Sequence, residues 1–212
     1  MSKICIFDLD GTLVDSMAYF AKGILSIADD AGIGYDSSLL KILTPLGYTK
    51  SAEYYVNVLG VDETVEALVK KIGERLVYQY SNNILLKPFV REYLKKLSAE
   101  GARLFVLTAS PHLVTDVCLE HNGVFGLFER VWSVEDFGLS KSSPELFHKV
   151  AGVIGCNECE IHYFDDSLIA LENAKKAGYV TYGVYDGQSE EEVTKMKNTL
   201  SDILVMSFDE LL

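Results

Sequence analysis

The feature that most constrains the fold of this chain is the alternation of short apolar runs with longer segments of helical spacing. Residues 90–99 show the second kind, because Val90, Tyr93, Leu94 and Leu97 share one helix face. Strands that alternate with helices form a parallel sheet covered on both faces. We therefore predict an α/β fold with three layers and a Rossmann-like parallel sheet. The expected strands are residues 4–7, 103–107, 130–132, 161–164 and 180–184, and the expected helices are residues 90–99, 113–121, 144–153 and 168–177.

Residues 16–86 interrupt this alternation. Helical patterns fill the segment, and no convincing strand separates them. The simplest interpretation is a small helical bundle inserted after the first strand. We predict two domains, a core of residues 1–15 and 87–212 and a helical domain of residues 16–86. The expected helices of the insertion are residues 17–31, 37–45, 50–59 and 62–80.

The overall charge restricts the kinds of partner. The chain has 212 residues and a formal net charge of -12, which repels nucleic acid and anionic membranes. No apolar run approaches the roughly 20 residues that a membrane-spanning helix needs, and the N-terminus leads into the first strand without a signal peptide. We expect a cytoplasmic monomer or homodimer that binds a small molecule and neither nucleic acid nor membrane.

Two cysteines, Cys156 and Cys159, have the spacing of a metal or redox pair. A zinc site would need a second pair of ligands with matching spacing, which the sequence does not offer. Redox pairs usually open a helix, whereas this pair precedes an expected strand. We interpret both residues as ordinary thiols.

Two aspartates, Asp8 and Asp10, follow the first expected strand. Ligands of open α/β sheets bind at this carboxyl edge. Two carboxylates so close together repel each other unless a cation or a shared proton lies between them. Gly11 allows a tight turn, and Thr12 offers a hydroxyl and a backbone N–H to an anion. Because Asp and Gly are also ordinary turn residues, this pattern alone does not establish a site.

Other polar side chains follow the remaining strands. Thr108 comes directly after the second expected strand, and Asp165 and Asp166 come directly after the fourth. Lys141 lies in a loop just before an expected helix, a suitable place for an ammonium to reach a phosphate. Carboxylates, a hydroxyl and an ammonium at one edge predict a site for a divalent cation and a phosphate. Oxygen-only ligation favours Mg²⁺ over zinc.

These segments resemble four sequence motifs of the haloacid dehalogenase (HAD) superfamily. The stretch DLDGTLVDS at residues 8–16 is similar to the first motif, and LTAS at residues 107–110 to the second. The stretch KSSPELF at residues 141–147 resembles the third motif, and FDDS at residues 164–167, continued by NAKKAG at residues 173–178, resembles the fourth. The order and spacing match over essentially the whole chain. The helical insertion lies where one HAD subfamily carries a helical cap.

The resemblance implies a magnesium-dependent phosphatase that hydrolyses a small phosphate monoester through an aspartyl-phosphate. Asp8 would be the nucleophile, and Asp10 the general acid and then the general base. Mg²⁺ would be held by Asp8, the backbone carbonyl of Asp10 and Asp166, with Asp165 as a supporting or water-linked ligand. The phosphate contacts that the resemblance implies are Gly11, Thr12, Thr108, Ala109 and Lys141.

One departure from the family pattern lies in the fourth motif. Family members often carry an acid or a glycine where this chain has Ala170, and a glycine or glutamate is common where it has Asp165. We therefore assign the direct metal contact to Asp166 rather than Asp165.

Several alternative functions stay open on this scaffold. A β-phosphoglucomutase-like phosphotransferase shares the core machinery and would depend on a bisphosphate activator. A non-catalytic phosphometabolite-binding protein would show no turnover, although every catalytic position is filled. Dehalogenation needs neither magnesium nor an acid such as Asp10, and phosphonate cleavage generally needs a lysine of the helical domain. A signalling receiver domain carries its phosphoacceptor after the third strand, not the first.

The substrate is expected to be selected by the loops of the helical domain. The segment LGYTK at residues 46–50 has the composition of a turn between two helices. Tyr48 and Lys50 are candidates for contacts with the leaving group, although plain surface residues are the simpler interpretation. Sugar phosphates, phosphoglycolate-like acids and nucleotides are all compatible with the sequence.

Overall fold

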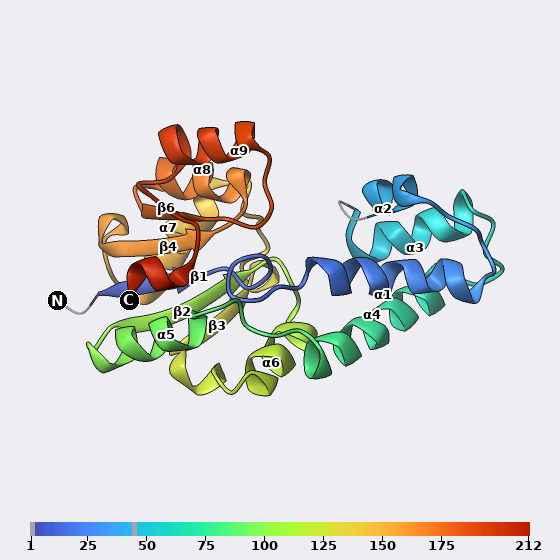
Figure 1. Ribbon diagram of the computed structural model, residues 1–212, viewed down its shortest axis with the longest axis horizontal. Helices are drawn as coiled ribbons and strands as arrows, with labels where there is room; N and C mark the ends of the chain where they lie inside the picture. Colours follow the sequence, from blue (N-terminus) through green and yellow to red (C-terminus); the bar gives the residue numbers. More distant parts are fainter. Residues whose placement is uncertain (1–2, 44–45) are drawn as a thin grey trace. The chain divides into compact units, whose positions relative to one another are not determined.

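The computed structural model of the protein describes residues 3–43 and 46–212. The chain divides into two compact units, one of Met1–Asp15 with Leu85–Leu212 and the other of Ser16–Ile84. Figure 1 shows the elements of both units, which are described separately below. In the described ranges, none of the helices combines the length and apolar character needed to cross a lipid bilayer.

The larger unit is built on a parallel sheet, for which the described residues supply six strands in the order β3-β2-β1-β4-β5-β6. The register places Phe7 of β1 beside Val106 on one side and Phe164 on the other. The predicted α/β fold with a parallel sheet is confirmed. The sequence analysis does not predict β6, because three residues at a sheet edge leave too short an apolar run. The strands are β1 (Ile4–Phe7), β2 (Arg103–Thr108), β3 (Arg130–Ser133), β4 (Ile161–Asp165), β5 (Val180–Val184) and β6 (Ile203–Val205).

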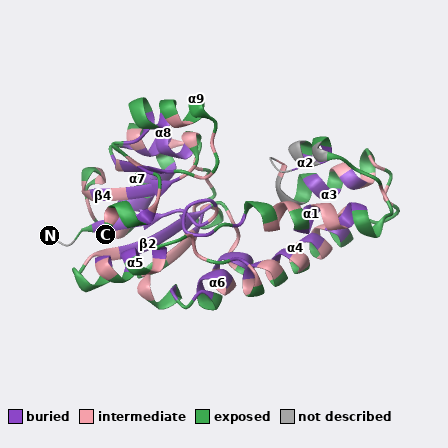
Figure 2. Ribbon diagram, viewed as in Figure 1, coloured by how far each residue is buried: buried purple, intermediate pink, exposed green. Residues whose placement is uncertain are grey.

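The two faces of the sheet pack against different layers. Ile6 belongs to the same buried cluster as Phe147 of α7. The next residue, Phe7, points to the opposite face because side chains alternate along a strand, and its ring packs edge-on against Tyr93 of α5. The central strands are therefore buried on both faces (Figure 2), which explains why β1 is apolar throughout. The helices of this unit are α5 (Val90–Ala99), α6 (His112–His121), α7 (Pro144–Ile154), α8 (Leu168–Ala177) and α9 (Glu190–Lys195).

Two helices of this unit begin beside the expected site. At the start of α7, the Ser143 side chain accepts a hydrogen bond from the N–H of Glu145 (3.2 Å), and Pro144 has a φ angle suited to a first turn. At the start of α8, the Ser167 side chain accepts one from the N–H of Ala170 (3.4 Å). These caps give the preceding loops a defined backbone.

The smaller unit is a bundle of helices. Tyr55 of α3 donates a hydrogen bond from its buried hydroxyl to the backbone oxygen of Ile24 on α1 (2.9 Å). Gly23 lets α1 and α4 approach closely, because an added Cβ would lie 2.7 Å from Leu76 Cδ2. The helices are α1 (Met17–Asp30), α2 (Ser37–Leu43), α3 (Gly47–Asn57) and α4 (Val65–Asn82).

One expectation for this unit is wrong. Residues 47–50 do not form a turn, because α3 begins at Gly47. Helix packing around the buried Ala52 and Tyr55 outweighs the weak local preference of a glycine for a turn. The helix predicted at residues 37–45 ends at Leu43, and its last two positions lie outside the described residues.

The chain leaves and re-enters the larger unit at neighbouring points. Val14 and Leu86 form an antiparallel bridge. The N–H of Asp15 donates to the oxygen of Leu85 (3.2 Å), and the N–H of Lys87 donates to the oxygen of Leu13 (2.9 Å). The helical insertion therefore begins and ends at two hydrogen-bonded segments.

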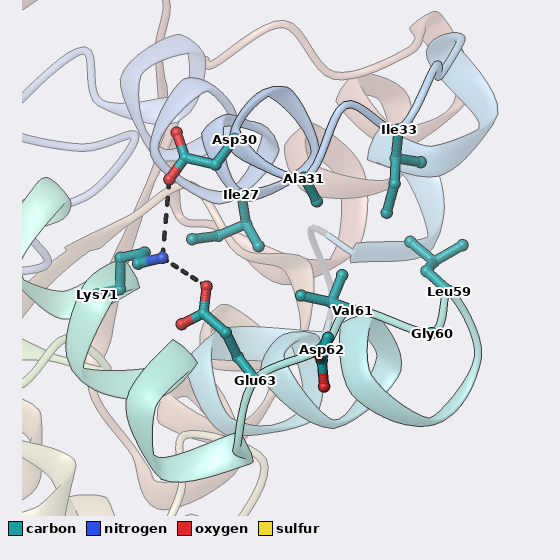
Figure 3. A pocket seen from close by; sticks show the side chains of 10 residues that line it. All are labelled: Ile27, Asp30, Ala31, Ile33, Leu59, Gly60, Val61, Asp62, Glu63 and Lys71. Carbon is teal, nitrogen blue, oxygen red and sulfur yellow. Dashed lines mark hydrogen bonds and ion pairs between the residues drawn. The ribbon is translucent and has the colours of Figure 1, made fainter.

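A pocket of about 680 Å³ lies within the helical unit, between the end of α1 and the loop that joins α3 to α4 (Figure 3). Ile27 and Val61 contribute apolar side chains to it. At one side, Lys71 Nζ lies 2.6 Å from Glu63 and 3.8 Å from Asp30. All three charged groups are partly exposed.

Candidate active site

The site lies where β1, β2 and β4 end. Asp8 directly follows β1, while Thr108 and Asp165 are the last residues of β2 and β4. The N–H of Asp8 donates to the oxygen of Phe164 (2.9 Å), which fixes the start of the loop. Asp8, Thr108 and Asp165 are all buried. Parallel strands in register thus bring together residues that lie far apart in the chain.

Lys141 joins two of these acids. Its Nζ contacts Asp8 Oδ1 at close range and lies 2.8 Å from Asp165 Oδ2. Burial opposes the charge of Lys141, but Asp165 and Asp8 outweigh this effect and raise the pKa of the ammonium above its ordinary value. Lys141 therefore stays protonated in this setting. The sequence prediction that Lys141 reaches the carboxyl edge is consistent with this geometry.

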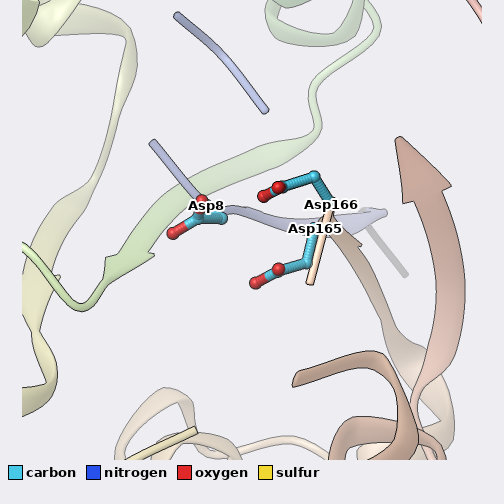
Figure 4. Close-up of side chains that lie close together, drawn as sticks. All are labelled: Asp8, Asp165 and Asp166. Atoms are coloured by element: carbon cyan, nitrogen blue, oxygen red, sulfur yellow. The ribbon is translucent and has the colours of Figure 1, made fainter. Parts of the chain in front are cut away.

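Asp166 completes a group of three carboxylates with Asp8 and Asp165 (Figure 4). One oxygen from each lies within 4.8 Å of the others. Burial, together with the charges of Asp165, Asp166 and Asp10, raises the pKa of Asp8 well above its ordinary value, although Lys141 opposes the shift. Burial and the charge of Asp165 raise the pKa of Asp166 to about 7.

The charges and donor atoms of this cluster can be compared with what a magnesium ion requires. Three carboxylates face one lysine, so negative charge is left uncompensated in a buried place. The available donors are all oxygens, as a hard divalent cation prefers. The residues present therefore fit Mg²⁺.

Asp165 has a different environment from the other two acids. Its Oδ2 accepts hydrogen bonds from Lys141 and, at close range, from the Tyr163 hydroxyl, and its Oδ1 accepts one from the N–H of Ser167 (2.7 Å). Both oxygens are thus held by protein donors. This arrangement suits a residue that orients its neighbours, whereas the sequence predicts a supporting or water-linked metal ligand at Asp165.

Asp10 lies on the turn after β1 and contacts the end of β2. Ser110 Oγ donates to Asp10 Oδ2 at 2.6 Å. The N–H of Ser110 in turn donates to Thr108 Oγ1 at 3.0 Å. Ala109, between them, is exposed. Ser110 thus connects two residues of the expected site without being one of them.

Gly11 and Thr12 hold the turn together. Their N–H groups donate to the oxygens of Val14 (3.0 Å) and Leu9 (3.3 Å), respectively. The N–H of Thr12, which the sequence analysis offers to an anion, therefore already donates a hydrogen bond within the loop. Gly11 has a φ of +76°, and an added Cβ would lie 2.8 Å from Asp166 Cγ, so the position requires glycine.

Several polar residues near Asp166 were not predicted from the sequence. Lys87 Nζ lies 2.7 Å from Asp186 Oδ1, and Gln188 Nε2 donates to the backbone oxygen of Asp166 (2.9 Å). Asp186 lies just past the end of β5. An acid that follows a strand belongs to the same sheet edge, so Asp186 could have been predicted from the sequence. Tyr163 was also recognisable, since it precedes Asp165 by two residues and shares its side of β4.

The structure does not test whether Tyr48 and Lys50, the candidates in the helical unit, contact the leaving group. Lys50 is exposed on α3, and the side chain of Tyr48 lies outside the described part of the chain. Cys156 and Cys159 are free thiols, one half-buried and one exposed.

Comparison with known proteins relates this geometry to characterised families. Residues 5–184 match the haloacid dehalogenase-like hydrolase family. A phosphoglycolate phosphatase from Haemophilus influenzae is 26% identical over 195 residues, covering 87% of this chain and 86% of that protein. A glyceraldehyde 3-phosphate phosphatase from Methanocaldococcus jannaschii is 25% identical over 224 residues, covering 100% and 96%. The crystal structure of YfnB from Bacillus subtilis bound to magnesium has the same fold, with a TM-score of 0.80, 17% identity, and coverage of 99% and 96%.

Proposed function

This chain belongs to the haloacid dehalogenase-like hydrolase family, and from that premise we propose that it is a magnesium-dependent phosphatase of small phosphorylated metabolites. One observation above all supports the proposal: Lys141 bridges Asp8 and Asp165, while an oxygen of Asp166 lies within 4.8 Å of both acids. This proximity supports assigning the nucleophile, the positive charge and the metal ligands to side chains at one sheet edge.

Asp8 is the nucleophile of the proposed reaction. One of its carboxylate oxygens attacks phosphorus, so a P–O bond to Asp8 forms while the bond to the leaving oxygen breaks. Asp10 gives its proton to that oxygen, and the product leaves as an alcohol. Lys141 remains positively charged beside Asp8 and stabilises the transferring phosphoryl group.

Asp10 takes the opposite role in the second step. Its carboxylate accepts a proton from a water molecule, and the water oxygen attacks the phosphorus of the aspartyl-phosphate. The P–O bond to Asp8 breaks, inorganic phosphate leaves, and both acids return to their starting forms.

Thr108 is suited to bind a non-bridging phosphate oxygen. Its hydroxyl oxygen accepts the N–H of Ser110, which leaves the hydroxyl hydrogen for another partner. Ala109 would contribute its N–H group from the same turn. The N–H groups of Gly11 and Thr12 instead shape the loop that presents Asp8 and Asp10.

Asp8, Asp166 and the backbone carbonyl of Asp10 would hold the magnesium ion, and Asp165 would orient Lys141 beside them. When bound, the ion supplies positive charge that offsets the repulsion between Asp8 and the phosphate.

We also propose that the helical unit, Ser16–Ile84, acts as the cap that selects the leaving group. Relatives named for phosphoglycolate and for glyceraldehyde 3-phosphate make short phosphorylated acids and aldehydes the first compounds to test. A panel of metabolite phosphates, ranked by kcat/KM, identifies the substrate class.

The proposal is tested by phosphate release from 4-nitrophenyl phosphate with Mg²⁺, after removal of divalent cations, and after Mg²⁺ is restored. We expect turnover, its loss in chelator and its recovery. Undiminished activity in chelator contradicts the metal role. Binding without turnover identifies a non-catalytic phosphometabolite-binding protein, and dependence on a sugar bisphosphate identifies a phosphoglucomutase-like transferase.

A further inference from the structure

Ser110 stands between two groups of the proposed reaction. Its hydroxyl donates to Asp10 Oδ2 at 2.6 Å, and its N–H donates to Thr108 Oγ1 at 3.0 Å. The first distance is short but ordinary for an O–H···O hydrogen bond, and an Asp10 oxygen can accept it in either protonation state of the carboxyl group. A bond of this kind fixes the rotation of the Asp10 carboxyl group about its last side-chain torsion, which is otherwise broad.

The backbone around Ser110 is itself well anchored. Thr115 Oγ1 on α6 lies 3.4 Å from the oxygen of Ser110 and donates to the oxygen of Pro111 at 3.1 Å. His112, the first residue of α6, places Nε2 at 2.9 Å from Asp136 and Nδ1 at 3.2 Å from Asp116. The turn from β2 into α6 therefore presents the Ser110 hydroxyl from a fixed position.

We propose that Ser110 is a positioning residue that holds the Asp10 carboxyl group in the orientation needed to transfer a proton to and from the leaving oxygen. This inference rests on the proposed function, because it assigns Ser110 a role through Asp10. Proton transfer needs an acid within hydrogen-bond reach and correctly aligned. Small misplacements of a catalytic group cost large factors in rate.

If Ser110 acts through Asp10, the loss of rate in Ser110→Ala should depend on whether the leaving group needs a proton. An alkyl phosphate has a poor leaving group that needs the proton, whereas 4-nitrophenolate leaves without one. Loss of a hydrogen bond that aligns a catalytic group corresponds to about tenfold in rate. We expect Ser110→Ala to lower kcat/KM about tenfold for the best alkyl phosphate of the metabolite panel and less than about threefold for 4-nitrophenyl phosphate.

Two further variants complete this comparison. Ser110→Thr keeps the hydroxyl and should stay within about threefold of the parent protein on both substrates. Ser98→Ala changes an exposed serine of α5 and serves as the matched control with unchanged kinetics. Thermal unfolding of all variants checks that the fold is intact.

A double-mutant cycle separates action through Asp10 from direct contact with phosphate. Phosphorylation of Asp8 by 4-nitrophenyl phosphate is followed by mass spectrometry in the Asp10→Asn protein and in Asp10→Asn with Ser110→Ala. We expect the second change to alter the rate by less than about twofold, because its partner is already disabled. An equal loss on both leaving groups, or a full additional loss in the Asp10→Asn background, overturns the inference.

Failure of this inference is distinct from failure of the proposed function. If the parent protein releases phosphate but Ser110→Ala shows no leaving-group dependence, only the role of Ser110 is wrong. If the parent protein releases no phosphate and forms no phosphorylated Asp8, the proposed function fails and the role of Ser110 fails with it.

Discussion

Both units of this protein contain a lysine held between two carboxylates, yet the two arrangements differ in their surroundings. In the larger unit, Lys141 contacts Asp8 and Asp165, and the lysine side chain is 12% exposed. In the helical unit, Lys71 contacts Glu63 and lies 3.8 Å from Asp30, and its side chain is 32% exposed (Figure 3). The charged groups are of the same kinds, but Lys71 is more exposed to water, and its distance to Asp30 is longer than either distance from Lys141 to its acids.

The difference shows that burial, rather than the combination of residues, decides what such a cluster does. Water and salt screen the charges around Lys71, and exposed ion pairs of this kind contribute little to stability. Around Asp8 and the half-buried Asp166, burial limits hydration and neighbouring carboxylates repel, so the pKa values of both acids rise. Unbalanced buried charge is a feature of sites that act on ionic ligands.

The largest contrast should come from removing one carboxylate charge in each cluster. Asp8→Asn eliminates the proposed nucleophile and should lower turnover by at least about 10³-fold. Asp30→Asn in the helical unit should stay within about twofold, because it removes an exposed charge from an ion pair. Phosphate release under saturating Mg²⁺ measures both, and circular dichroism checks folding. Appreciable turnover by Asp8→Asn would contradict covalent catalysis.

Replacing each lysine by methionine compares the stability of the two clusters. Lys141→Met leaves Asp8 and Asp165 buried without their cation, which should cost about 3–5 kcal/mol at neutral pH in metal-free protein. Lys71→Met should cost less than about 1 kcal/mol. Urea unfolding of both variants gives the two free energies. Equal losses would show that burial is not the deciding factor.

Asp166 in the buried cluster should make its own contribution to the pH dependence of stability. An aspartate has an ordinary pKa of about 3.9, and the pKa of folded Asp166 is about 7. Between these values the folded state binds more protons than the unfolded state, so metal-free stability should fall as pH rises from about 4 to 7, by at most about 4 kcal/mol.

This slope is measured by urea unfolding at several pH values. Asp166→Asn should reduce the slope, and the raised pKa of Asp8 accounts for the part that remains. Saturating Mg²⁺, which favours the ionised acids, should reduce it as well. Asp30→Asn is the matched control and should leave the slope unchanged. A slope of undiminished size in Asp166→Asn would place its origin elsewhere.

The smallest contrast concerns one glycine in each unit. Gly11 and Gly60 have φ values of +76° and +71°, but an added Cβ meets Asp166 at the first and nothing within 4 Å at the second. Gly60→Ala should cost about 1–2 kcal/mol from backbone strain. Gly11→Ala should lower the free energy of unfolding by more than this. It should also weaken Mg²⁺ binding and lower turnover, because Asp166 must move. Similar kinetics for both variants would argue against a critical position of Asp166.

Much of the fold was predictable because it depends on side-chain polarity along the chain. Strands buried on both faces, such as β1, stand out as continuous apolar runs. The end of β4 was less visible, since Asp165 is polar but still pairs with Gly183 in the sheet. The start of α3 was mispredicted because packing within the helical unit, rather than local composition, determines it.

The candidate site was predictable to the extent that strand ends determine it. Asp8, Thr108 and Asp165 meet because parallel strands end at one edge, and their chemical roles stay predictions. The contacts made by Ser110 and Tyr163 were not evident, because they depend on which way a side chain turns after the backbone is placed. The excess of buried negative charge around Lys141 was not evident from the sequence either, because it depends on how deeply each side chain is buried.

The paired segments at Val14 and Leu86 have a consequence for how such proteins diversify. The insertion starts and finishes at one hydrogen-bonded pair of segments. The larger unit therefore needs only these two neighbouring points to accommodate it. A different insertion, of other length or sequence, could be joined at the same two points while Asp8 keeps its neighbours. Under the proposed function, substrate preference would be free to change in this one segment while the residues that cleave the bond stay the same.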